Sequence, residues 1–169
     1  MVRHGHAGDK KSWHGPDTVR PLSEAGLQQA EGLAENLHSL MAPTRLLTSP
    51  YARCNQTLVP LAKRAGRVIQ PCDLLAPDAS PAALDRYLRD HLDDETVYCT
   101  HGETLKALFG LWLRAGSIQL LADGTPVDQN RTEKGAAWVV MTDQPRVAHY
   151  LRPLHIGPPL TNTAAPVGC

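Results

Sequence analysis

Two arginines and two histidines of this chain are of the residue types that bind and transfer phosphoryl groups. Arg3 and His4 stand near the beginning of the chain, and Arg53 and His101 each follow a later apolar segment. An arginine fork matches phosphate oxygens bidentately, so two forks can neutralise a dianion. An imidazole held between them could attack phosphorus and give a phosphohistidine that water then hydrolyses. The second imidazole, when protonated, would share the charge on the transferring group.

Three junctions between a strand and the following segment must position these side chains. The sequence predicts strands that end at Arg3, at Thr48 and at Thr100, each followed by a loop or helix. Ligands of open α/β sheets bind outside the carboxyl ends of the strands, so the three junctions would bring the four side chains to one edge. The alternative is that they are unrelated surface arginines and capped histidines.

Helix signals recur between these strands. Ser23 is a predicted N-cap, and apolar residues then recur at three- and four-residue steps as far as Met41. Ser49-Pro50 and Ser80-Pro81 each read as an N-cap followed by the first helical position, where proline has no N–H to lose. Gly66 and Gly116 are expected to end the second and fourth helices. Arg53 would then lie in a first helical turn, where free N–H groups favour an anion.

Strands that alternate with helices predict an α/β fold with a mostly parallel sheet. A further strand is expected at residues 67–70, and a final hairpin at 136–142 and 146–151. Residues 5–21, 71–79 and 117–134 show no regular period and are expected to be loops. We expect one domain over residues 1–152 and a Pro- and Gly-rich tail over residues 153–169.

Composition limits the classes of partner. Lys and Arg total 17, and Asp and Glu total 17, so no overall field attracts a nucleic acid polymer or an anionic membrane. No apolar run approaches the roughly 20 residues of a spanning helix, and no secretory signal is evident. The four cysteines lack Cys-x-x-Cys spacing, which suits a cytoplasmic protein. His4, His6 and His101 could in principle hold a metal, but two arginines nearby would repel a divalent cation, so we expect no metal and no cofactor.

Several segments match a known family in order and spacing. They are Arg3-His4-Gly5, then Arg20-Pro21-Leu22-Ser23-Glu24-Ala25-Gly26 with Gln29-Ala30, then Thr48-Ser49-Pro50-Tyr51-Ala52-Arg53 with Gln56-Thr57, and finally Thr100-His101-Gly102. The chain resembles the histidine phosphatase superfamily, which includes the phosphoglycerate mutases. The resemblance implies a three-layer α/β/α sandwich, with His4 as the phosphorylated nucleophile and Arg3, Arg53 and His101 as the phosphate pocket.

Two branches of that superfamily are similar to this chain. Its small size and the Arg-Pro-Leu run resemble the phosphohistidine-phosphatase branch. The stretch Asn130-Arg131-Thr132-Glu133-Lys134-Gly135-Ala136-Ala137-Trp138 looks like the phosphatase-like domain fused behind Nudix hydrolases in actinobacteria, although no Nudix motif occurs here.

The general acid is the part of the family pattern that this sequence leaves open. Asp78 and Glu103 are both candidates; Lys10 occupies the place where mutases carry an asparagine. Beside Lys10, we expect Arg3, Gly5, Arg53 and His101 to bind the substrate. A phosphoramidate nitrogen can be protonated before cleavage, so a phosphohistidine substrate can be hydrolysed without this acid. Mutase activity is therefore the least favoured.

These residues predict a metal-independent phosphatase that hydrolyses a phosphate ester or phosphoramidate through His4. Its substrate would be a phosphorylated small molecule, a nucleotide or a phosphohistidine protein. The alternative is a non-catalytic phosphate-binding module, or a nucleotide-processing domain related to the Nudix-fused proteins. Because only two residues precede Arg3, we also expect that a few added apolar residues upstream would stabilise the first strand.

Overall fold

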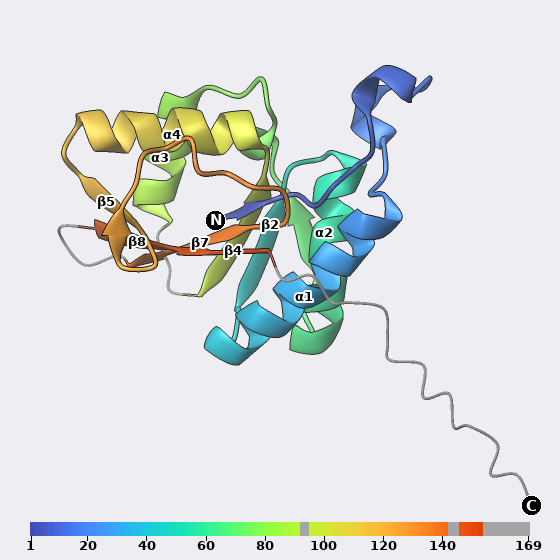
Figure 1. The fold of residues 1–169 in the computed structure, drawn as a ribbon, viewed down its shortest axis with the longest axis horizontal. Coiled ribbons are helices and arrows are strands. Elements are labelled where there is room, and N and C mark those ends of the chain that lie inside the picture. Colours follow the sequence, from blue (N-terminus) through green and yellow to red (C-terminus); the bar gives the residue numbers. More distant parts are fainter. Residues whose placement is uncertain (92–94, 142–145, 154–169) are drawn as a thin grey trace, which may run out of the picture.

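The structure is a computed structural model, and it describes residues 1–91, 95–141 and 146–153. The described residues form one eight-stranded sheet in the order β3-β2-β4-β1-β7-β8-β5-β6 (Figure 1). The strands are β1 (Val2–Arg3), β2 (Arg45–Thr48), β3 (Ile69–Pro71), β4 (Thr96–Thr100), β5 (Ile118–Ala122), β6 (Thr125–Pro126), β7 (Ala137–Met141) and β8 (Arg146–Leu151).

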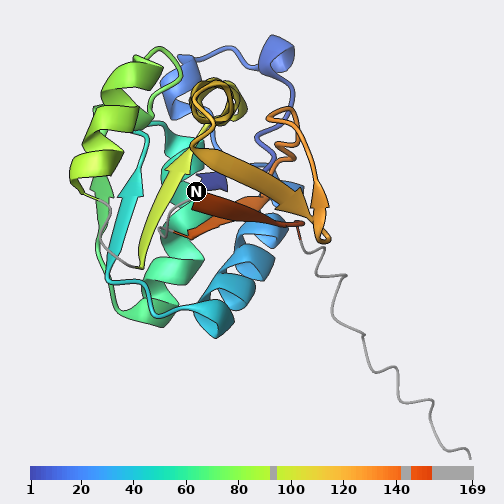
Figure 2. The same ribbon diagram turned by 90° about the vertical axis from the view of Figure 1, so that its left-hand side faces the viewer.

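Two pairs of helices cover the two faces of this sheet, which confirms the three-layer α/β/α sandwich (Figures 1 and 2). Helices α1 (Glu24–Leu40) and α2 (Ala52–Ala65) pack on one face, in a core with Leu46, Val97 and Cys99. Helices α3 (Pro81–Asp90) and α4 (Gly102–Arg114) pack on the other, in a larger core that includes Phe109 and Trp138. Each helix buries the apolar stripe that its sequence carries.

The sheet is parallel in one half and mixed in the other. β3, β2, β4 and β1 run parallel to one another. β7 is antiparallel to both of its neighbours, β1 and β8. β5 pairs in parallel with β8 and antiparallel with β6. The prediction of a mostly parallel sheet therefore holds for the half from which the candidate residues arise.

Helix starts were predicted well in two of three cases. Ser23 and Ser80 are N-caps, because their hydroxyls accept hydrogen bonds from the N–H groups of Gly26 and Ala83. The prediction for Ser49 is wrong, since α2 begins at Ala52. Ser49 instead extends the sheet: its N–H donates to the carbonyl of Cys99, at 2.9 Å, and its buried hydroxyl contacts a histidine ring.

The segment predicted as an irregular loop at residues 117–134 contains a hairpin, β5–β6. Alternating burial of Ile118, Leu120 and Ala122 gives β5 the period of a half-buried strand. Its turn, Asp123-Gly124, has positive φ at both residues, 51° and 76°, as a type I′ turn requires. Strand β3 lies at Ile69–Pro71, slightly later than predicted.

Three further segments of the loops form short 3₁₀ turns, named η1 (Lys10–Ser12), η2 (Asp17–Val19) and η3 (Asp73–Leu75). Residues 142–145, between the strands of the predicted final hairpin, lie outside the described residues, as do residues 154–169 of the predicted tail. No helix within the described ranges has the length and apolar character that a membrane span requires.

Candidate active site

Arg53 lies between the rings of His4 and His101 at the carboxyl ends of the parallel strands. Its Nε donates to His4 Nε2 at 3.3 Å, and its Nη2 lies 3.3 Å from His101 Nδ1. The two imidazole rings are 5.2 Å apart, centroid to centroid, and meet edge to face. All three side chains are buried. Three strand ends thus bring together side chains that are separated by about half the chain.

The short strand β1 is held on both sides, so His4 has a rigid support. Its register pairs Val2 with Cys99 of β4 and with Ala137 of β7. Beyond the strand, His4 N–H donates to the carbonyl of Thr100, at 3.0 Å, and the N–H of Gly135 reaches the carbonyl of His4, at 3.1 Å. These backbone contacts hold the nucleophile candidate between β4 and β7.

The segment Asn130–Trp138 clamps the same strand end. The guanidinium of Arg3 donates through Nη1 to the carbonyl of Thr132, and Trp138 Nε1 donates to the carbonyl of Arg131, at 3.2 Å. Gly135 has φ +76°, and a Cβ there would lie 2.9 Å from Gln29 Cβ. This segment therefore positions Arg3 and His4.

A hydrogen bond fixes the tautomer of His4. Its Nδ1 lies 2.7 Å from the carbonyl of Gly5, and a carbonyl can only accept, so Nδ1 carries the proton and Nε2 keeps its lone pair. Gly5 N–H donates to Thr57 Oγ1, at 3.0 Å, and the Thr57 hydroxyl donates to the carbonyl of Arg53, at 2.7 Å. Gly5, which was expected to bind substrate, thus orients the imidazole and is not among the residues that line the cavity described below.

Two glutamines of the family motifs hold the loop that follows β1. Gln29 Oε1 accepts from the N–H of His6, and Gln56 Oε1 accepts from the N–H of Leu22, both at 2.8 Å. His6 Nδ1 contacts the Ser23 hydroxyl at 2.7 Å.

Within the described ranges, no group of three or more His, Cys, Asp and Glu side chains is arranged to hold a metal ion.

Burial and neighbouring guanidinium groups keep both histidines neutral. Burial lowers the pKa of His4 to about 4, aided by the positive charges of Arg53, Arg3 and Arg20. Burial and the neighbouring His4 and Arg53 lower the pKa of His101 to about 3. An unprotonated Nε2 on His4 is the state that a nucleophile requires.

His101 is supported from behind by residues of the β2–α2 junction. Its Nε2 lies 2.9 Å from Ser49 Oγ, and because Nδ1 faces the Arg53 donor, Nε2 carries the proton. The ring of Tyr51 stands edge-on to the imidazole at 4.8 Å, and the Arg53 guanidinium lies 4.6 Å from the centroid of the same ring. No sequence signal singled out Tyr51 beyond its place in the family motif.

A cavity of about 610 Å³ opens in front of His4 and Arg53. It is much larger than one phosphate group, and basic side chains predominate among its charged residues. Those residues are Arg3, Asp9, Lys10, Asp17, Arg20, Arg53, Glu103 and Lys134.

The candidate acids differ in position. Glu103 lines the cavity, where it interacts electrostatically with Arg3. Asp78 is exposed in a turn that is closed by the hydrogen bond from Ala79 N–H to the carbonyl of Ala76, at 3.2 Å, and it does not line the cavity. The structure therefore gives no support to Asp78 as the acid.

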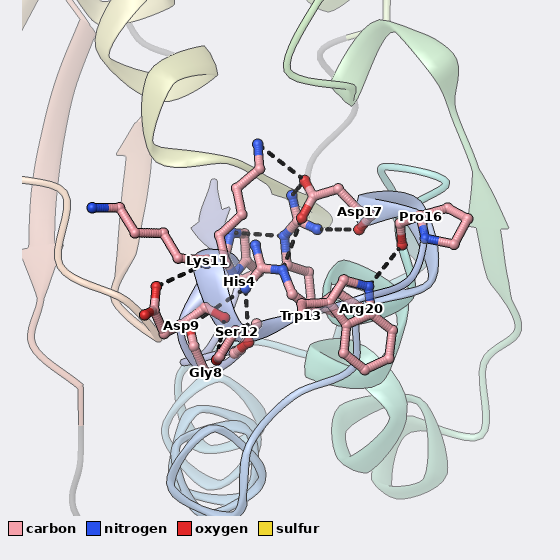
Figure 3. Close-up of polar contacts among 12 residues, drawn as sticks. His4, Gly8, Asp9, Lys11, Ser12, Trp13, Pro16, Asp17 and Arg20 are labelled. Atoms are coloured by element: carbon pink, nitrogen blue, oxygen red, sulfur yellow. Dashed lines mark hydrogen bonds and ion pairs between the residues drawn. The ribbon is translucent and has the colours of Figure 1, made fainter.

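Asp17 is a cavity residue that no sequence motif singled out, and Arg20 was expected only as part of the Arg-Pro-Leu run that could add positive charge near the pocket. Asp17 Oδ1 accepts from Arg20 Nε at 2.8 Å, and Asp17 Oδ2 lies 3.2 Å from Arg53 Nη2 (Figure 3). Arg20 is itself buried and donates to the carbonyl of Ala7, at 2.7 Å. The available signal was an acid, Asp17, three residues before the arginine that opens the Arg-Pro-Leu run.

The carboxyl group of Asp17 is held in its charged form. Desolvation raises its pKa, but the hydrogen bond from Arg20 and the positive charges of Arg53, Arg20 and Lys10 outweigh this and leave the pKa below its usual value. Asp17 is consequently a poor proton donor at neutral pH.

The sequence of this chain is similar to that of the 8-oxo-(d)GTP phosphatase of Mycolicibacterium smegmatis (strain ATCC 700084 / mc(2)155). It is 34% identical over 161 residues, which cover 90% of this chain and 47% of the relative. The chain thus spans about half the length of that protein.

Solved structures share the fold at lower identity. The protein histidine phosphatase SixA in complex with tungstate superposes with a TM-score of 0.68 at 20% identity, over 90% of this chain and 94% of that one. A SixA described as a putative phosphohistidine phosphatase, from Agrobacterium tumefaciens, gives a TM-score of 0.65 at 22% identity, over 90% and 95% of the two chains. Residues 1–76 match the model of the histidine phosphatase superfamily (branch 1). This match over a little under half of the chain makes its first part similar to the histidine phosphatase superfamily, and the described fold is the one seen in the SixA structures.

Proposed function

We propose that this protein is a metal-independent phosphatase that works through a phosphohistidine on His4. The observation that carries the proposal is the orientation of His4. Its Nδ1 proton is fixed on the Gly5 carbonyl, and its Nε2 lone pair faces the guanidinium of Arg53. A neutral imidazole beside an arginine fork is the arrangement that phosphoryl transfer to nitrogen needs.

The reaction would proceed in two displacements. In the first, His4 Nε2 forms a bond to phosphorus while the bond from phosphorus to the leaving group breaks, and the leaving group takes up a proton. In the second, water attacks phosphorus, the P–N bond breaks, and inorganic phosphate and neutral His4 are released. Arg3 and Arg53 would stabilise the charge that spreads over the equatorial oxygens, and His101 would join them when the bound dianion favours its protonated form.

Glu103 is the candidate that supplies the proton to an alkoxide leaving group. It lines the cavity on the side of Arg3, whereas Asp17 is held in its charged form by two guanidinium groups. A general acid contributes roughly 10²–10⁴-fold to such a step. A Glu103→Gln variant is therefore expected to lose much more activity toward an alkyl phosphate than toward a phosphoramidate.

The similar proteins suggest two substrate classes. The similarity to SixA proteins favours a phosphohistidine side chain, and the similarity to the 8-oxo-(d)GTP phosphatase favours a nucleotide. The size of the cavity and the basic side chains of Lys10, Arg20 and Lys134 beyond the nucleophile suit a substrate with more than one anionic group. We therefore place a nucleotide phosphatase beside the phosphohistidine phosphatase as the second candidate.

The central experiment compares the protein with a His4→Ala variant in the hydrolysis of an aryl phosphate. We expect vanadate-sensitive turnover that EDTA leaves unchanged, an acid-labile phosphoenzyme, and loss of both in the variant. Turnover that persists in the variant would refute the role of His4. Thermal stabilisation by phosphate with no turnover on any substrate would instead favour a non-catalytic binding module.

A substrate panel then separates the two classes. It compares a phosphohistidine peptide, ordinary and 8-oxo-guanine nucleotides and sugar phosphates at equal concentrations, with His4→Ala as the control for each. A Lys134→Ala variant should lower kcat/KM for a nucleotide more than for the peptide, because its ammonium adds a cation to the cavity that a further anionic group of a nucleotide could use. Equal losses for both substrates would remove the support for the nucleotide.

A further inference from the structure

Asp17 places a carboxylate among the cations that face the cavity. Its Oδ1 accepts from Arg20 Nε at 2.8 Å, and its Oδ2 lies 3.2 Å from Arg53 Nη2 and 3.7 Å from Lys10 Nζ. Figure 3 shows this carboxylate pointing from its 3₁₀ turn toward the side chains around His4. The side chain is 27% exposed, so it borders the cavity that a ligand would enter.

The donors of Arg53 are largely occupied in this arrangement. A guanidinium has five N–H groups. One of them meets His4 Nε2, one meets His101 Nδ1, and two meet Asp17, through its backbone carbonyl at 2.8 Å and through Oδ2. A bidentate contact between Arg53 and a phosphate needs two free parallel donors. One N–H group is left, so a bidentate contact requires at least one of these partners to withdraw, and the Asp17 carboxylate is the anion among them that a phosphate would replace.

We propose that Asp17 is a built-in competitor for the phosphate pocket, whose carboxylate occupies Arg53 until a dianionic oxyanion displaces it. A monoanion would only replace one negative charge on Arg53 by another. A dianion brings a second charge and a third oxygen, and these can also reach Arg3 and Lys134 in the same cavity. Removal of this carboxylate should therefore strengthen the binding of every oxyanion that uses Arg53.

The inference rests on the proposed function only in taking the cavity as a phosphoryl-binding site. Competition by Asp17 and a purely structural role of Asp17 predict opposite changes in oxyanion affinity when the carboxylate is removed. If Asp17 served only to hold Arg53 in position, its removal would weaken the binding of an oxyanion. If it competes with the oxyanion, its removal strengthens that binding.

The test measures the affinity of inorganic phosphate and of tungstate by calorimetry for the full chain, Asp17→Asn and Asp9→Asn. Asp9 lines the same cavity without a contact to Arg53, and asparagine can keep its cap on the N–H of Lys11. The Asp9 variant thus measures the general effect of removing one negative charge. We expect Asp17→Asn to bind both dianions roughly tenfold more tightly or better, and Asp9→Asn to change affinity by less than about threefold.

Selectivity provides a second measurement. In Asp17→Asn, binding of the monoanion dimethyl phosphate should also strengthen, but by less than binding of phosphate, because the removed charge repels a dianion more strongly than a monoanion. Unchanged or weaker binding of the dianions in Asp17→Asn, an equal gain in Asp9→Asn, or a larger gain for the monoanion than for phosphate would each overturn the proposal.

A crystal structure of the unaltered protein with tungstate avoids any dependence on the folding of a variant. The oxyanion is expected within hydrogen-bond distance of Arg53 Nη2, with the Asp17 carboxylate no longer in contact with that nitrogen. An oxyanion bound while the Asp17 contact persists would contradict the proposal. Because these measurements read binding, tighter binding without any aryl phosphate turnover would uphold this inference and refute the proposed catalysis.

Discussion

At the scale of single residues, the site depends on how closely backbone and side chains approach. Gly102 follows His101 at the start of α4 and faces the guanidinium of Arg3. A Cβ at residue 102 would lie 2.8 Å from both Cζ and Nε of Arg3, closer than real Cβ contacts. The glycine of the Thr100-His101-Gly102 motif thus leaves room for the arginine of the first motif.

A Gly102→Ala substitution is therefore expected to displace Arg3 without unfolding the protein, because the side chain that must move has a flexible end. We expect kcat/KM for an aryl phosphate to fall roughly tenfold or more, since a displacement of about 1 Å in a positioning group can cost about 10²-fold. The melting temperature should stay close to that of the unaltered protein.

The matched control is Gly110→Ala on the same helix. Its added Cβ would meet the end of the Arg114 side chain at 3.3 Å and the Gln129 side chain at 3.8 Å, an ordinary contact distance, and alanine favours the helix. Unaltered kinetics in Gly102→Ala, or equal losses in both variants, would show that Gly102 does not set the position of Arg3.

At the scale of the elements, α1 crosses the loop after β1 at a glycine. A Cβ on Gly26 would lie only 2.0 Å from the carbonyl oxygen of His6, which is backbone and cannot rotate away. The same carbonyl accepts hydrogen bonds from the N–H and hydroxyl of Ser23. The helix N-terminus and the site loop therefore form one rigid unit.

A Gly26→Ala substitution should push the N-terminus of α1 away from the backbone of His6. It should destabilise the protein by about 3 kcal/mol, at the upper end of typical overpacking costs. The free energy of unfolding in urea measures this loss. Leu27→Ala, at a neighbouring residue of α1 that is 51% exposed, should change stability by less than about 0.5 kcal/mol. A loss in Gly26→Ala no larger than that in Leu27→Ala would contradict the close crossing.

The elements also show which sequence signals were sufficient. Caps at Ser23 and Ser80 were predictable because a hydroxyl before an apolar-periodic stretch has few alternatives. Ser49 carries the same local signal, but its hydroxyl is used by His101, which is 52 residues away in the chain. The β5–β6 hairpin was missed although Asp123-Gly124 is a turn signal, since polar residues around it masked the alternation of buried residues.

The candidate site was predictable to the extent that it depends on strand ends. Arg3, His4, Arg53 and His101 each follow a predicted strand, and parallel strands place their carboxyl ends together. Asp17 and Arg20 reach the cavity through a loop, and their positions follow from long-range contacts to Arg53 and to the backbone rather than from any local period.

At the scale of the whole molecule, acids and bases are balanced over the sequence while the cavity gathers cations. Two neutral histidines lie within this arrangement, both buried. The free energy of unfolding is therefore linked to pH through groups that belong to the site.

The sign of this linkage follows from the two pKa values. The folded protein keeps His4 neutral down to about pH 4 and His101 down to about pH 3, whereas both have a pKa near 6.5 when unfolded. Between those limits the unfolded chain binds more protons than the folded one, so the stability present above pH 6.5 is lost as the pH falls. Each histidine contributes a slope of at most about 1.4 kcal/mol per pH unit. The buried Met1 amino group acts in the same direction, because desolvation lowers its pKa from 8.0 to about 5.

We therefore expect the free energy of unfolding in urea to decrease steadily from pH 7 to pH 5, and a His101→Asn variant to show a shallower decrease. The difference between the two slopes isolates His101, since the contributions of His4 and Met1 are common to both proteins. His149→Asn, which alters an exposed histidine of β8, is the matched control and should keep the original slope. Because a bound dianion favours protonated histidines, saturating phosphate should flatten the dependence of the unaltered protein. Equal slopes for the original protein and His101→Asn would contradict a histidine kept neutral by burial beside Arg53.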